Sequence, residues 1–257
     1  MDRAALRSTR HYVYWANTYS GAQCIIGRAN LDGSGAIQNF IEMSGFSFPA
    51  GIAVDGTYLY LNDSYNNAIT RATLDGTSVN RYFITGAGGI YANNGMVGVA
   101  VDPNYIYWDN VSSNTIGRAN LNGTGVNQSF ITLGGATGLQ YLTVDGTYIY
   151  WSNINTSSIG RAKLDGTGVN QNFITGITQP TGIAVDGVYI YWVNQYNTIG
   201  RASLDGTGIN YSFITVPSSN FNGNGPGLAV SSIPEPSTGL LVIAGLLGLG
   251  GWRRVRA

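Results

Sequence analysis

Four aspartates recur at the same position of a repeated unit, and they are the first residues of this chain that could do chemistry. They are Asp55, Asp102, Asp145 and Asp186. An acid–base pair or a calcium cage needs several oxygens that converge on one point. One acid in each unit, placed at a turn, instead indicates a repeated structural role in which the carboxylate accepts backbone hydrogen bonds. We therefore predict that these aspartates stabilise turns and bind no metal.

Other reactive side chains are scarce. His11 is the only histidine and Cys24 the only cysteine, so the chain can form no internal disulfide and no thiolate metal cluster. The sequence shows no Ser-His-Asp set, Cys-His pair or phosphate loop. We expect no catalytic residue, no metal and no cofactor.

Charge argues against nucleic acid as a partner. The chain has 13 basic and 13 acidic residues among 257. Arginines recur at one repeat position, as Arg28, Arg71, Arg118, Arg161 and Arg201. Binding to phosphates needs clustered positive charge, whereas these arginines are spread around the fold. We predict instead that they bind carbonyls or acids of neighbouring repeats.

The repeat itself predicts the architecture. Five units start at an aromatic pair or its equivalent, at Tyr14-Trp15, Tyr60-Leu61, Tyr107-Trp108, Tyr150-Trp151 and Tyr191-Trp192. Each unit continues through Arg-Ala, Leu-Asp/Asn-Gly and Phe-Ile, and the period is 40 to 47 residues. Each can be divided into four short strands, with Asp-Gly or Asn-Gly hairpin turns that accept positive φ angles. This pattern predicts an all-β fold, a β-propeller of four-stranded antiparallel blades with five blades visible.

The Tyr-Trp pair and the Asn or Asp two positions after it resemble the YWTD repeat of low-density lipoprotein receptor class B propellers. The resemblance covers residues 11–230, and the final Asp is Asn in four of the five units. It implies a propeller fold, although the ring of that family usually has six blades. Blade number is therefore left open by the resemblance.

The two ends of the repeat region predict how the ring closes. The first unit begins at a second strand, residues 11–15, whereas Gly227–Val230 is a first strand without followers. We expect the late strand to complete the first blade, so that residues 11–231 form the propeller after an unstructured start at residues 1–10. Closure would remove exposed sheet edges.

The C-terminal tail predicts where the protein is localised in the cell. A linker at residues 232–237 contains Pro234, Glu235 and Pro236. It is followed by an apolar segment at residues 238–252, expected to be a helix, and by a basic end at residues 253–257 that contains Arg253, Arg254 and Arg256. An apolar segment followed by arginines is typical of membrane insertion with the arginines in the cytoplasm. Its 15 residues are short for a full span, and a terminal helix buried against the propeller is the alternative.

This tail resembles the PEP-CTERM sorting signal of exported proteins in Gram-negative bacteria. The resemblance implies cleavage by an exosortase, an inner-membrane intermediate held by the helix, and delivery to the cell surface or extracellular matrix. Residues 1–10 contain charges and no apolar core, unlike a signal peptide. We therefore expect a longer reading frame that encodes one and that could also encode a sixth blade.

Binding residues are expected on the face that carries the variable loops, because recognition normally lies in loops on a rigid frame. The candidates are aromatic and amide side chains, at Phe46, Phe48, Tyr65, Tyr91, Asn93, Asn94, Tyr196 and Phe221. Such side chains suit sugars or protein surfaces. We hypothesise a monomeric, non-enzymatic module that binds a polysaccharide or an envelope protein. The alternatives are a lyase or lactonase with its site at the central channel mouth, and a purely architectural matrix protein.

Overall fold

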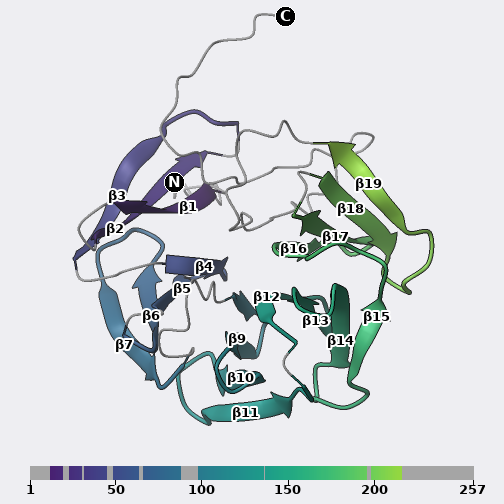
Figure 1. The fold of residues 1–257 in the computed structure, drawn as a ribbon. Helices are drawn as coiled ribbons and strands as arrows, with labels where there is room; N and C mark the ends of the chain where they lie inside the picture. The colour runs from purple at the N-terminus through teal and green to yellow at the C-terminus, as the bar shows by residue number, and fades with distance from the viewer. Residues whose placement is uncertain are drawn as a thin grey trace, which may run out of the picture.

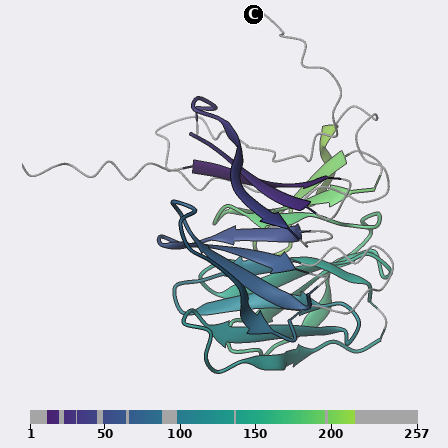
Figure 2. The same cartoon turned by 90° about the vertical axis from the view of Figure 1, so that its left-hand side faces the viewer.

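The computed structural model describes residues 12–19, 23–30, 32–44, 49–63, 66–87, 98–135, 137–195 and 198–215. These residues form five antiparallel sheets that stand around a common centre, as Figure 1 shows. The predicted all-β propeller is confirmed. The view from the side (Figure 2) shows the strands of successive sheets stacked face to face.

Four sheets have four strands each and contain the predicted strand order. Their strands are β4 (Pro49–Val54), β5 (Tyr58–Asp63), β6 (Ala68–Thr73) and β7 (Val79–Thr85); β8 (Val99–Val101), β9 (Tyr105–Asn110), β10 (Thr115–Asn120) and β11 (Asn127–Thr132); β12 (Leu139–Val144), β13 (Tyr148–Asn153), β14 (Ser158–Lys163) and β15 (Asn170–Ile174); β16 (Ile183–Val185), β17 (Tyr189–Asn194), β18 (Thr198–Ser203) and β19 (Asn210–Thr215). Strands β4, β12 and β16 lie toward the centre in Figure 1, and β7, β11, β15 and β19 lie at the periphery.

The remaining sheet has three strands in the described part of the chain, β1 (Tyr12–Tyr19), β2 (Gln23–Asn30) and β3 (Ile37–Ser44). They correspond to the second, third and fourth strands of the other blades. The strand expected to complete this sheet, at Gly227–Val230, lies outside the described residues, and so do the tail and residues 1–10.

Three of the Tyr-x-Tyr-Trp strands are buried on both faces, as their sequence predicts, whereas Val13 and Trp15 of β1 are half-buried. In β9, β13 and β17 the five residues after the first tyrosine are buried. The Trp108 ring lies over Gly117 on the neighbouring strand, where a Cβ atom would come within 2.2 Å of Trp108 Cε2. The glycine is therefore required by the ring, and Gly27, Gly160 and Gly200 make the same contact with their own tryptophans.

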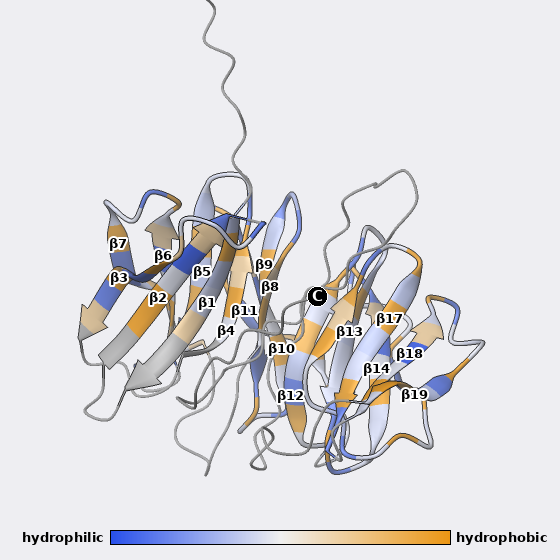
Figure 3. Ribbon diagram, turned by 90° about the horizontal axis from the view of Figure 1, so that it is seen from above, coloured by the Kyte–Doolittle hydropathy of each residue, from blue (hydrophilic) through white to orange (hydrophobic). Residues whose placement is uncertain are grey.

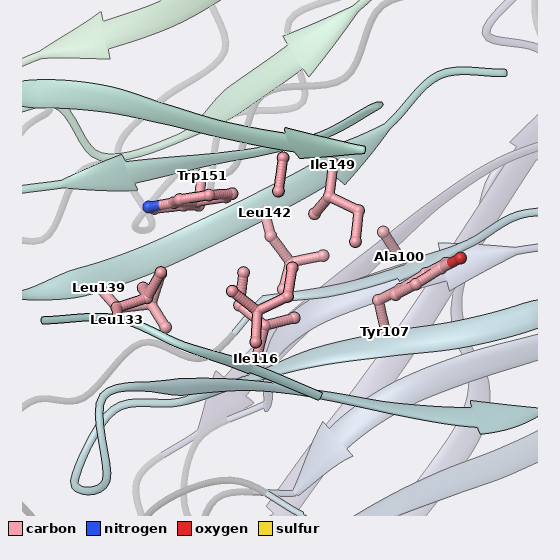
Figure 4. Close-up of a cluster of buried hydrophobic side chains, with 10 residues drawn as sticks. Ala100, Tyr107, Ile116, Leu133, Leu139, Leu142, Ile149 and Trp151 are labelled. Carbon is pink, nitrogen blue, oxygen red and sulfur yellow. The ribbon is translucent and has the colours of Figure 1, made fainter. Parts of the chain in front are cut away.

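The core lies between neighbouring sheets. Figure 4 shows Ile116 and Leu133 from one blade facing Leu142 and Trp151 of the next. Complete burial of such a side chain contributes about 1.5–3 kcal/mol, so each blade is stabilised mainly by its neighbours. In Figure 3 the hydrophobic colour accordingly follows the strands and the hydrophilic colour gathers in several turns.

The hairpin turns differ in part from the expectation. Glycines of the turns between third and fourth strands have positive φ, as at Gly76 (76°) and Gly123 (85°). Between first and second strands, Gly187 has φ of 87°, but Gly56 and Gly146 are not among the positive-φ glycines. The preceding aspartate stabilises all three of these turns; Asp55 Oδ1, for example, accepts the main-chain N–H groups of Thr57 and Tyr58, both at 2.6 Å.

One contact between blades is absent at the place where the ring must close. At four junctions a phenylalanine lies against the glycine of the next blade's Leu-Asp/Asn-Gly turn; the pairs are Phe40–Gly76, Phe83–Gly123, Phe130–Gly166 and Phe173–Gly206. Gly33, the equivalent glycine of the first blade, has no such neighbour within 4 Å among the described residues. Ile214 of the last blade is half-buried, whereas its counterparts Ile131 and Ile174 are 2% and 1% exposed.

Candidate functional site

The propeller has two ends of different composition. In antiparallel blades, the turns between first and second strands and between third and fourth strands share one end, and the remaining turns and the connections between blades share the other. We call the first end the turn face, which comprises residues 32–36, 55–57, 74–78, 102–104, 121–126, 145–147, 164–169, 186–188 and 204–209. The loop face comprises the described residues 66–67, 86–87, 111–114, 133–135, 137–138, 154–157, 175–182 and 195.

On the turn face, the recurring aspartates are occupied by their own blades. Asp102 Oδ1 accepts the N–H groups of Asn104 and Tyr105, both at 2.7 Å, and Oδ2 accepts the Tyr107 hydroxyl at 2.8 Å. The other three, at Asp55, Asp145 and Asp186, have the same arrangement. The predicted structural role of these aspartates is therefore confirmed. Burial, the hydrogen bond and the charge of Asp186 raise the pKa of Tyr191 to about 12.

The turn face also presents exposed carboxylates. Asp75 accepts hydrogen bonds from Thr73 and Thr77, which lower its pKa to about 2. Asp32, Asp165 and Asp205 are exposed at equivalent turns, and hydrogen bonds lower their pKa values too. This face therefore carries an exposed carboxylate at the turn between third and fourth strands in each unit except the one in which Asn122 replaces the aspartate.

The recurring arginines connect blades. The Arg118 guanidinium lies between the rings of Tyr105 and Phe130, 4.3 and 3.8 Å from their centroids. It donates to the main-chain carbonyl of Leu164 in the next blade at 3.1 Å. Equivalent bonds join Arg28 to Leu74, Arg71 to Leu121, and Arg161 to Leu204, which confirms the prediction that these arginines bind a neighbouring blade.

The loop face has a different chemistry, because none of its described residues is charged. Its exposed side chains are hydroxyls and amides, at Ser112, Ser113, Asn155, Thr156, Thr175, Thr178 and Gln195. Hydroxyl and amide groups both donate and accept hydrogen bonds. A neutral, polar surface of this kind matches ligands that carry many hydroxyl groups and no charge.

The loops of this face are held in fixed conformations. The four described non-glycine residues with positive φ all lie on it, at Asn67, Asn114, Ser157 and Gln179. Asn114 also ties its turn to the next connection, because Nδ2 donates to the Leu133 carbonyl at 2.9 Å and Oδ1 accepts the Thr137 hydroxyl at 2.7 Å. Unusual backbone conformations persist where the surroundings fix them, so the described loops form a preorganised surface.

Beneath the loop face lies a layer of buried polar groups. Asn110, Asn153 and Asn194, the last residues of the Tyr-Trp-x-Asn segments, donate to main-chain carbonyls of the outer strands, at Gln128, Gln171 and Tyr211. They join the second strand of a blade to its fourth strand. Asp109 belongs to this layer as well, and sequence analysis missed it because it stands at the variable position of the Tyr-Trp-x-Asn segment, where no pattern singles it out.

The candidate binding residues named from the sequence, Phe46, Phe48, Tyr65, Tyr91, Asn93, Asn94, Tyr196 and Phe221, all lie outside the described residues. The sorting residues Pro234, Glu235, Pro236, Arg253, Arg254 and Arg256 lie outside them too, as does His11. Within the described residues, no three His, Cys, Asp or Glu side chains come together as metal ligands would. No helix of the described part of the chain is long and apolar enough to cross a bilayer.

Comparison with known proteins supports the repeat assignment. Residues 147–186 match the family model for low-density lipoprotein receptor repeat class B. This chain is a β-propeller with a YWTD-type repeat. The match spans one repeat, from the second strand of one blade to the first strand of the next. No curated protein matches the sequence.

Solved propellers of several kinds resemble this one in structure. A chain of a nidogen/laminin complex is 21% identical with a TM-score of 0.61, over 80% of this chain and 75% of that one. Virginiamycin B lyase from Staphylococcus aureus is 19% identical with a TM-score of 0.54, over 79% and 70%. A gluconolactonase from Xanthomonas campestris is 16% identical with a TM-score of 0.56, over 73% and 68%. At these identities the likeness shows the fold alone.

Proposed function

We propose that this protein is an exported, non-enzymatic binding module whose loop face recognises an uncharged polysaccharide of the cell surface or extracellular matrix. The observation that carries the proposal is the contrast between the two faces. Every described residue of the loop face is neutral, whereas the turn face carries exposed carboxylates. A neutral polyol gains hydrogen bonds on the loop face without leaving a charge unpaired.

A binding role without catalysis agrees with the hydrogen bonds that the recurring aspartates already accept. Each recurring aspartate of the turn face is engaged by the backbone and tyrosine of its own blade. A general acid or base must have a proton-transfer partner within reach in a substrate complex, and these carboxylates are committed to turns. A lyase or lactonase activity remains the alternative hypothesis, since propellers of both kinds share this fold.

The destination of the protein is proposed from its tail. The Pro-Glu-Pro motif, the apolar segment and the terminal arginines resemble a PEP-CTERM signal, so we propose exosortase processing near Pro234–Pro236 after insertion through the C-terminal helix. Mass spectrometry of the C-terminal peptide from surface-released protein tests this directly. A mature form that still ends at Ala257 would contradict it.

The binding proposal is tested by measuring affinity for purified matrix polysaccharides, neutral and acidic, with isolated envelope protein as a third ligand. We expect saturable binding to a neutral fraction. Gln195→Glu places a carboxylate on the loop face, and loss of one hydrogen bond together with the new charge should weaken binding about fivefold or more. Asn104→Asp makes the same amide-to-acid change on the turn face and should leave affinity unchanged.

Three outcomes would contradict the proposal. They are preference for an acidic polysaccharide, binding of envelope protein alone, and equal loss of affinity in both variants. Absence of saturable binding to any fraction would favour the architectural role instead.

A further inference from the structure

One position of the repeat lies at every described junction between blades, directly after the Tyr-Trp pair or its equivalent. We call it the junction position; it is Ala16 in the first blade, where it is half-buried, and Asn62, Asp109, Ser152 and Val193 in the blades that follow. The last four residues are buried, with exposed fractions of 0%, 0%, 0% and 2%. Polar residues are retained at three of them, although a buried polar group costs free energy unless it is hydrogen-bonded.

Ser152 shows what a polar group does at this position. Its hydroxyl accepts the main-chain N–H of Tyr141 on its own blade at 3.2 Å and donates to the Thr181 carbonyl of the next blade at 2.6 Å. The hydroxyl therefore bridges two blades by donating a hydrogen bond to a main-chain carbonyl.

The strand registers identify the matching carbonyl at the preceding junction. Leu142 pairs with Trp151 and Ile183 pairs with Trp192, so these two inner strands are equivalent residue by residue. By the same count Gln140 is equivalent to Thr181. The Gln140 carbonyl is therefore the counterpart, at the Asp109 junction, of the Thr181 carbonyl that Ser152 binds.

Asp109 lies in a buried site between two blades. Both carboxyl oxygens are buried, and neither accepts a hydrogen bond from the protein. The backbones around them are close: a Cβ atom at Gly98 would lie 2.7 Å from Leu142 N and 3.2 Å from Asp109 Oδ2. An ionised carboxylate can only accept hydrogen bonds, whereas a protonated one has an O–H to donate.

We propose that Asp109 is held as a neutral carboxylic acid that donates a hydrogen bond to the Gln140 carbonyl of the next blade, as Ser152 does one junction later, and that its ionisation loosens this junction beneath the loop face. The connection that contains Leu133, Thr137 and Gly138 leads directly into β12, so the same bond supports part of the candidate binding surface. The chain would then bind its ligand on a firmer surface in acid than in alkali.

The direction of the pKa shift of Asp109 agrees with a neutral carboxylic acid. Burial raises the pKa of Asp109 well above its usual range, and the nearby N–H groups of Gly98 and Asp109 itself offset this only in part. Tyr141 is the titratable group that faces it from β12, and burial together with the Asp109 charge raises the pKa of Tyr141. Of the other charged groups of these blades, Asp102, Asp145, Asp165, Arg118 and Arg161 are bonded or stacked near the turn face, and Lys163 is exposed at the end of β14.

The sign of the pH effect follows from linkage. Because the pKa of Asp109 is higher in the folded than in the unfolded protein, its contribution to stability is complete below the unfolded pKa of about 3.9. That contribution is lost as pH rises through the folded pKa. The stability of the wild-type protein relative to a variant without the carboxyl group should therefore fall between acidic and alkaline pH.

The test compares the wild-type full chain with its Asp109→Asn and Asp109→Ser variants by thermal unfolding from pH 4 to pH 9. Asparagine and serine already stand at the junction position of other blades, as Asn62 and Ser152. We expect wild type and variants to unfold at similar temperatures in acid, and the variants to unfold about 4 °C or more above wild type in alkali. Asp75→Asn is the control of opposite sign, because lowering of the Asp75 pKa makes wild type the more stable protein above pH 4.

A direct readout separates ionisation from packing. Infrared difference spectra of wild type against Asp109→Asn should show a protonated carboxylic acid at pH 7. An ionised carboxylate in that spectrum, or a difference in unfolding temperature that does not change with pH, would overturn the proposal. If Asp109→Ser fails to fold, the spectrum of the wild-type protein still decides.

Discussion

The Arg118 guanidinium donates to the main-chain carbonyl of Leu164 across the boundary between two blades, at 3.1 Å. It is placed there by two rings of its own blade, Tyr105 and Phe130. The same three-part arrangement of tyrosine, arginine and phenylalanine recurs in every blade. A charged group is thus held between aromatic faces and directed at its neighbour.

Replacement of this arginine should weaken the array. Arg118→Met removes a hydrogen bond from a charged donor and a cation–π contact, which together are worth about 2–4 kcal/mol. Equilibrium unfolding in urea should show that loss. Lys163→Met removes a charge from an exposed side chain on β14 and should change stability by less than about 0.5 kcal/mol. Similar losses in both variants would show that general charge, not the contact between blades, is responsible.

The tryptophan ring over Gly117 makes a sharp prediction about side-chain volume. Gly117→Ala would place a Cβ atom 2.2 Å from Trp108 Cε2, and overpacking of a core typically costs about 1–3 kcal/mol. Gly146→Ala is the matched control, because a Cβ atom at Gly146 has nothing within 4 Å. We expect a clear fall in unfolding temperature for the first variant only. Equal behaviour of the two alanine variants would contradict the packing described here.

Alkaline pH should unfold the propeller through its buried tyrosines. The pKa of Tyr191 is raised to about 12, and burial beside an aspartate raises the pKa values of Tyr60, Tyr107 and Tyr150 as well. Since the folded pKa exceeds the unfolded value of about 10, their contribution is complete below pH 10 and is lost above it. Unfolding followed with pH should therefore begin above pH 10, and Tyr191→Phe should make the fall less steep. A slope identical to that of wild type would count against this explanation.

Ring closure is tested by truncation. If Gly227–Val230 completes the three-stranded first sheet, a chain that ends at Ile233 should be as stable as the full chain. A chain that ends at Pro226 should lose about 3 kcal/mol or more, because apolar side chains and a strand ladder are removed. Equal stability of the two truncated chains would show that this segment does not close the ring. Retention of the strand before the Pro-Glu-Pro motif would also leave the processed protein closed.

The strands and turns could be predicted because the same residue types recur at the same positions of each unit and make the same contacts there. Tyr107 and Trp108 point to opposite faces of their strand and both are buried, as expected for a strand that is apolar on both faces. Asp102 accepts main-chain hydrogen bonds in a turn, as its position predicts. Positive φ is absent at Gly56 and Gly146, although Asp55 and Asp145 stabilise their turns as Asp186 does before Gly187, so the conformation of this turn could not be predicted from the Asp-Gly pair alone.

The candidate site was less predictable, because it depends on what surrounds single residues. Asp109 and Ser152 occupy the same position in otherwise similar segments, and only the closeness of Gly98 to β12 shows that the Asp109 carboxyl is buried without a hydrogen-bond partner. The neutrality of the loop face likewise depends on residues far apart in sequence, such as Ser112, Thr178 and Gln195, which the antiparallel blades bring to one end. The composition of the whole chain does not show that the two ends differ in charge.

The central claim is that the neutral loop face, and not the acidic turn face, recognises the ligand. Hydrogen–deuterium exchange of the protein with and without neutral matrix polysaccharide tests it most directly, because both faces are read in one experiment. The account predicts slower exchange at residues 111–114, 154–157 and 175–182, with no change at the Asp-Gly turns. Protection of the turns around Asp75, Asn122 and Asp165, with the loop face unchanged, would contradict it.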